Sequence, residues 1–96
     1  MEKIVRDGLV AVAVSPGYGA GWSTWNDIDP RDARLNQLFL DGNVDEVQRI
    51  CDEEGLGYAG GARDVEIFWV PEGTQFRIDE YDGSESLVTT DDWITA

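Results

Sequence analysis

Carboxylates are the chemical groups that this chain offers most abundantly. Of its 96 residues, 20 are Asp or Glu and only 7 are Lys or Arg, so the formal net charge is −13. Histidine is absent, which removes the commonest general base and every Ser-His or Cys-His nucleophile pair. A single cysteine without histidine also removes the usual zinc ligand sets. The composition therefore predicts a protein that is not an enzyme, with no catalytic residues, no metal site and no cofactor.

Exposed acids form the first candidate binding site. Residues 1–25 are neutral, so the excess negative charge lies in residues 26–96. Such a charge repels nucleic acid and attracts basic protein surfaces. Carboxylates on neighbouring strand positions, or one helical turn apart, also form rows that resemble the phosphates of a nucleic acid. The acids assigned to this surface are Asp45, Asp52, Glu53, Glu54, Asp79, Glu80, Asp82, Glu85, Asp91 and Asp92. The alternative is the solvated face of an ordinary acidic protein.

A loop rich in glycine and aromatic residues is the second candidate site. Residues 15–26 contain three glycines at alternate positions, which is typical of a flexible loop. Tyr18, Trp22 and Trp25 lie on it, and exposed Tyr and Trp side chains are common anchors of protein interfaces. The alternative is that Trp22 and Trp25 cover the end of the core, because large aromatic side chains are mostly buried.

The same glycines suggest a different kind of ligand. Successive backbone N–H groups at Gly17–Gly21 can bind an anion, and Arg63 or Arg77 can assist. The spacing of a dinucleotide-binding motif and the Lys-Ser/Thr of a P-loop are both missing. A small-molecule-binding protein that captures a nucleotide signal is therefore an alternative function. Each arginine also has acidic neighbours with which it can pair instead.

Strands are expected near both ends of the chain. Asp7-Gly8 is a two-residue hairpin turn between residues 4–5 and 9–14. The second of these strands is apolar on both faces, which predicts that both faces are covered. Further strands are expected at residues 65–70, 75–81 and 87–90, with Asp82-Gly83 as a second hairpin turn and Trp93-Ile94 closing the sheet.

Two helices are expected between these strands. The first begins at Asp29-Pro30, as N-cap and first helical position, and ends at Gly42. The second begins at Asn43, within a capping box, and ends at Gly55. Cys51 lies on the apolar stripe of the second helix, so we expect a small core residue rather than a nucleophile.

This order of elements predicts an α+β fold in a single domain, residues 1–96. We expect one antiparallel sheet, made of the N-terminal hairpin and the C-terminal meander, packed against the two central helices. No apolar run approaches the roughly 20 residues of a membrane-spanning helix, and the N-terminus lacks the pattern of a signal peptide. We therefore expect a cytoplasmic protein that does not contact membranes.

Two segments resemble small proteins of phages and prophages. They run from Val14 to Trp25 and from Val70 to Gly83. In size, acidity and single-domain character the chain is also similar to phage-encoded anti-CRISPR and other anti-defence proteins. This resemblance implies inhibition by steric blockade or DNA mimicry, and it assigns no role to any residue.

Together these features predict an acidic phage-type inhibitor that acts in the host bacterial cell. We expect it to bind the basic, nucleic-acid-binding surface of a CRISPR-Cas or other defence complex and to block binding of target DNA. Direct binding of nucleic acid is not expected, because the charge of the chain repels it. Two alternatives stay open: a protein that binds a nucleotide signal, and a structural or housekeeping phage protein.

Overall fold

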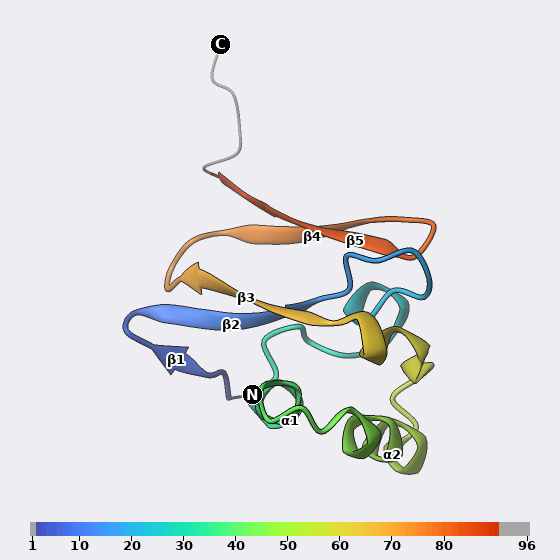
Figure 1. The fold of residues 1–96 in the computed structure, drawn as a ribbon. Coiled ribbons are helices and arrows are strands. Elements are labelled where there is room, and N and C mark those ends of the chain that lie inside the picture. The colour runs from blue at the N-terminus through green and yellow to red at the C-terminus, as the bar shows by residue number, and fades with distance from the viewer. Residues whose placement is uncertain (1, 91–96) are drawn as a thin grey trace.

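The computed structural model describes residues 2–90. In chain order the elements are β1 (Val5–Arg6), β2 (Leu9–Val14), the 3-10 helix η1 (Ser23–Trp25), α1 (Ala33–Leu40), α2 (Val44–Glu54), the 3-10 helix η2 (Ala59–Asp64), β3 (Glu66–Pro71), β4 (Phe76–Tyr81) and β5 (Ser84–Thr89). They form three layers, with α1 and α2 on one side of the sheet β1-β2-β3 and the hairpin β4-β5 on the other (Figure 1). The α+β class that the sequence predicts is confirmed.

The strands form two antiparallel sheets rather than the single sheet that the sequence predicts. β2 pairs with β1 and, over its whole length, with β3, whereas β4 and β5 form a separate sheet. The physical reason is the apolar face of the first sheet, where Val10, Val12 and Val14 need cover. Folding the hairpin over this face buries these valines against side chains such as Phe76 and Leu87. In a single extended sheet the valines and the apolar side chains of the hairpin would both be exposed to water.

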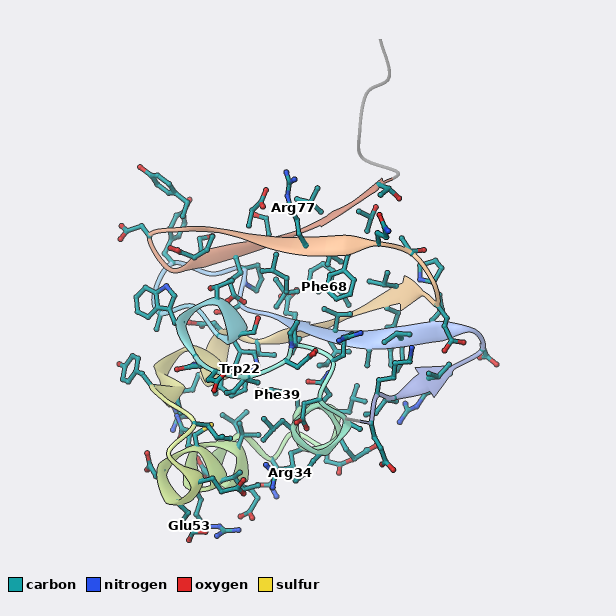
Figure 2. All side chains as sticks on the ribbon, turned by 180° about the vertical axis from the view of Figure 1, so that it is seen from behind. Trp22, Arg34, Phe39, Glu53, Phe68 and Arg77 are labelled. Carbon is teal, nitrogen blue, oxygen red and sulfur yellow. The ribbon has the colours of Figure 1, made fainter. Side chains whose placement is uncertain are left out.

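Strand β2 is covered on both faces, as its sequence predicts. Val12 has no exposed surface and lies in the core between the two sheets, into which Phe68 of β3 also points (Figure 2). Ala13 has no exposed surface either and packs in the core of the helix layer, together with Trp22 and Leu35. The alternation of side chains along one strand thus supplies both cores.

Helix α1 begins later than the sequence predicts. Asp32 caps it in place of Asp29, and the Asp32 Oδ1 accepts a hydrogen bond from an amide of the first turn at 3.1 Å. The Asp29 carboxylate instead accepts hydrogen bonds from Arg31 N at 2.8 Å, Nε at 3.0 Å and Nη2 at 2.8 Å. Pro30 O accepts another from Ala13 N at 2.9 Å, so this segment is held against β2 before the helix begins.

Helix α2 and both hairpin turns agree closely with the sequence-based predictions. The helix ends at Gly55, whose φ of 64° is left-handed, although Asn43 makes no side-chain capping bond. Asp7-Gly8 has φ values of 52° and 76°, and Asp82-Gly83 has 50° and 88°, as two-residue turns of type I′ require. Trp93-Ile94, expected to close the sheet, lies outside the described residues.

Candidate functional site

The glycine-rich loop folds around a buried carboxylate. The sequence predicts Glu85 of β5 on the exposed acidic surface, but its side chain is inside the protein and the residue is 1% exposed. Its Oε1 accepts a hydrogen bond from Ser15 N at 2.9 Å. Its Oε2 accepts three, from Trp22 N at 2.8 Å, Thr24 N at 3.1 Å and Thr24 Oγ1 at 2.6 Å. The expectation of an exposed Glu85 is therefore wrong, because the strand turns it toward these donors.

The loop thus binds an anion, but that anion is part of the protein. The backbone donors Ser15 N, Trp22 N and Thr24 N are directed at Glu85 and are not free to hold a phosphate. Arg63 Nη2 lies 3.6 Å from Asp45, and Arg77 Nε lies 2.9 Å from Asp79. Both arginines therefore pair with acids, and the nucleotide-binding alternative loses the free cations that it invokes.

The aromatic residues of the loop differ in their surroundings. Trp22 has no exposed surface and meets Phe39 of α1 edge to face, with ring centroids 5.3 Å apart (Figure 2). It belongs to the core, so the expectation that it contacts a partner is wrong. Tyr18 is 101% exposed and Trp25 is 47% exposed, and both are available at the surface.

Exposed aromatic residues belong to the loop, the start of η2 and the end of β4, segments that lie near one another at one end of the molecule (Figure 1). Within residues 2–90 five large apolar side chains are exposed, and four of them are aromatic. Tyr18 and Tyr81 line one hollow of about 370 Å³ together with Asp79, Glu80, Ser84 and Ser86. We call this region the aromatic–acid end, which consists of Tyr18, Trp25, Tyr58, Asp79, Glu80, Tyr81 and Asp82.

Close contacts hold the segments of the aromatic–acid end together. Asn26 Nδ2 donates to Tyr58 O, and Asn26 Oδ1 accepts from Tyr58 N, both at 2.7 Å. Gly83 in the β4-β5 turn lies so near the loop that a Cβ placed on it would be 1.5 Å from Gly19 O. Only glycine fits there, and the loop packs directly against the β4-β5 turn.

The acids of the aromatic–acid end are mostly without a cation. Asp79 accepts a hydrogen bond from Arg77 Nε at 2.9 Å. Glu80 Oε1 accepts one from Gly83 N at 3.0 Å, within its own turn. In the described part of the chain neither Glu80 nor Asp82 has an ion pair, so both charges face solvent unneutralised.

The acids of α2 are instead paired with arginines. Glu46 and Glu53 flank Arg49, three and four residues away along the helix. Arg34 donates two hydrogen bonds to Glu54, at 2.8 and 3.1 Å. The hydrogen bond from Arg49 holds the pKa of Glu46 below its ordinary value, and the bond to Glu54 raises the pKa of Arg34. Much of the negative charge of this helix is therefore neutralised locally.

The predicted acids fall into two groups on opposite sides of the molecule. Figure 2 places Glu53 on the outer side of the helix layer and Arg77, which pairs with Asp79, on the outer face of the hairpin. Asp45 and Asp52, also on α2, are exposed. Asp91 and Asp92 lie outside the described residues. Within residues 2–90 no single row of carboxylates contains both groups.

The inward position of Glu85 is the main feature of the site that differs from the sequence-based expectation. The Asp82-Gly83 turn sets a register in which Glu85 lies opposite Glu80 and on the same face as Leu87. Because Leu87 packs in the core, the two-residue period of the strand sends Glu85 inward as well. A strand that begins at residue 87, as the sequence predicts, leaves Glu85 outside the sheet, although the Asp82-Gly83 turn already implies a strand that starts at Ser84.

Other parts of the described chain are weaker candidates for a functional site. A hollow of about 580 Å³ at the far end of β4 is lined by Asp29, Arg31 and Phe76 among others, but Arg31 already binds Asp29, and this bond lowers the pKa of Asp29. Cys51 is buried, as expected of a core residue, and burial raises the pKa of its thiol. Residues 2–90 hold no group of three or more side chains arranged for a metal ion, and none of their helices has the length and apolar character to cross a membrane.

Searches for similar proteins find no family model, no curated protein and no solved structure that matches the chain. We therefore infer a function from the arrangement of residues described above.

Proposed function

We propose that the protein is an inhibitor that docks its aromatic–acid end on a basic protein surface. The observation that carries this proposal is the hollow shared by two exposed tyrosines, Tyr18 and Tyr81, beside the acids Asp79 and Glu80. Tyrosine rings offer a large contact area and stack on guanidinium groups. Carboxylates beside them favour a basic partner and disfavour an acidic one. The hollow therefore suits a basic side chain, above all an arginine, of the partner.

The partner that we propose is the nucleic-acid-binding surface of a bacterial defence complex such as a CRISPR effector. Such surfaces hold phosphates with Lys and Arg, and a net charge of −13 steers the protein toward them. The resemblance in size and acidity to phage anti-defence proteins supports the same class. We favour steric occlusion by one end of the molecule over mimicry of a long DNA, because arginines neutralise most acids of α2.

Binding to a panel of purified CRISPR effector complexes, measured by interferometry with target DNA as competitor, tests this proposal. We expect the protein and DNA to exclude one another. Affinity should fall about tenfold or more between about 50 and 300 mM salt, because exposed charges are screened. An affinity that is indifferent to salt would contradict electrostatic docking. Recovery of virion components alone from infected cells would favour the structural alternative.

Two triple variants with the same change in charge separate the aromatic–acid end from α2. They are Asp79→Asn with Glu80→Gln and Asp82→Asn, and Asp45→Asn with Asp52→Asn and Glu53→Gln. We expect the first to weaken binding about tenfold or more and the second about threefold or less. Equal losses would indicate that net charge, rather than this site, determines binding.

A further inference from the structure

Glu85 is a buried acid that no cation within residues 2–90 neutralises. The seven ion pairs of these residues leave it out, and four N–H and O–H donors of the loop satisfy its carboxylate. Removing a carboxylate from water is costly, so such groups occur where hydrogen bonds compensate for the loss. A carboxylate suits four donors because it presents only acceptors, whereas an amide would turn its own N–H groups toward some of them.

Hydrogen bonds to Glu85 hold the loop on both sides of its glycines. Ser15 and Glu85 exchange two hydrogen bonds, of which one involves the carboxylate: Ser15 N donates to Oε1 at 2.9 Å, and Glu85 N donates to Ser15 O at 2.8 Å. Beyond the glycines Trp22 N donates to Oε2 at 2.8 Å. Residues 16–21 therefore form an arch between two points held by one side chain, and Tyr18 lies within that arch.

The same side chain links the arch to the hairpin. Tyr81 is the last residue of β4, and Glu85 is the second residue of β5 across the turn. We propose that Glu85 is the positioning residue of the aromatic–acid end, which fixes Tyr18 relative to Tyr81 and so preforms the hollow between them. That this positioning serves the binding of a partner rests on the proposed function. Two tyrosines whose backbone segments are held in place lose less entropy on binding than two on mobile segments.

Amide hydrogen exchange of the full chain, followed by NMR, tests the positioning without any partner. In Glu85→Gln we expect the amides of Ser15 and Trp22 to exchange about tenfold faster or more, while amides in the middle of β2 do not change. Glu66→Gln removes the same charge from an exposed position on β3 and is the matched control. Unchanged exchange in the loop of Glu85→Gln would overturn the proposal.

A rescue experiment separates the carboxylate from the packing of its side chain. Glu85→Ala leaves a small space beside the four donors, and about 100 mM acetate should slow the exchange of the loop amides again. Chloride at the same concentration is the control. If acetate fails to restore slow exchange, packing rather than the carboxylate holds the loop, and the proposal is wrong. If Glu85→Ala does not fold, the exchange of Glu85→Gln decides.

Binding of Glu85→Gln and Glu66→Gln to the effector panel tests the consequence for the interface. We expect the affinity of Glu85→Gln to be about tenfold lower or more. The affinity of Glu66→Gln should stay close to that of the unsubstituted protein. Equal affinities together with faster loop exchange in Glu85→Gln would overturn the positioning role and leave the proposed function intact. Absence of binding by the natural chain would contradict the proposed function, while the exchange data would still show whether Glu85 holds the loop.

Discussion

Helix α2 and the hairpin β4-β5 are both rich in acids, but the two regions treat their charge differently. On α2 four of the five acids lie in ion pairs with arginines. On the hairpin Asp79 alone is paired, Glu85 is buried without a cation, and Glu80 and Asp82 remain unneutralised within the described residues. The number of acids in a segment therefore does not locate a binding site. The hairpin differs because its free acids stand beside exposed tyrosines.

The difference follows from the geometry of the two elements. On a helix, residues three and four apart are neighbours, so Arg49 reaches both Glu46 and Glu53. On a strand, neighbouring residues point to opposite faces, so Arg77 reaches Asp79 but not the residue beside it, Glu80. A single cation thus neutralises fewer acids on the hairpin than on the helix.

Truncating one glutamate in each region should give the largest contrast. Glu85→Ala leaves buried donors without an acceptor, at about 1–3 kcal/mol for each unsatisfied group, so we expect a loss of about 3–5 kcal/mol in the free energy of unfolding. Glu53→Ala removes only an exposed ion pair, and we expect little change. Urea denaturation followed by tryptophan fluorescence measures both. Similar losses in the two variants would contradict the distinction between the regions.

Replacing a left-handed glycine by alanine in each region should give a smaller difference in stability. Gly55 ends α2, and Gly83 lies in the β4-β5 turn. Gly55 has a φ of 64° with nothing near its Cβ position, so Gly55→Ala should cost about 1 kcal/mol. Gly83 has a φ of 88° and faces Gly19 O, so Gly83→Ala adds a backbone clash and should cost about 3 kcal/mol or more. Thermal unfolding of both variants tests this. Equal costs would mean that the loop does not pack on the β4-β5 turn.

The smallest effect is expected from the ion pairs of α2. Because Arg49 lowers the pKa of Glu46 in the folded protein, the pair stabilises the fold above the ordinary pKa of glutamate, and this contribution is lost as the pH falls through the lowered pKa. Arg49→Ala should return the pKa of Glu46 toward its ordinary value, as a carboxyl NMR titration would show. Arg63→Ala is the control, and an unmoved Glu46 titration in Arg49→Ala would contradict the pairing.

Much of the local structure is predictable from the residues. Asp7-Gly8 and Asp82-Gly83 form the expected hairpin turns, because these dipeptides tolerate the left-handed backbone that such turns require. The start of α1 is not predictable in this way, since Arg31 takes the carboxylate of Asp29 that would otherwise cap the helix. The aromatic loop is only partly predictable. Anion binding by its backbone is foreseen, but at Gly17–Gly21, whereas the observed donors flank that stretch and the anion they bind is Glu85.

Composition alone dictates the large negative charge. Short-range stereochemistry dictates the turns and the strand with two apolar faces, because these depend on residues adjacent in the chain. The fate of the individual acids and aromatic residues depends on the packing of the three layers. Glu85 meets loop donors 61 to 70 residues away, and Tyr18 shares its hollow with Tyr81. Folding the hairpin over the sheet brings these groups together. Which of these side chains are buried and which are exposed is therefore decided by the tertiary structure.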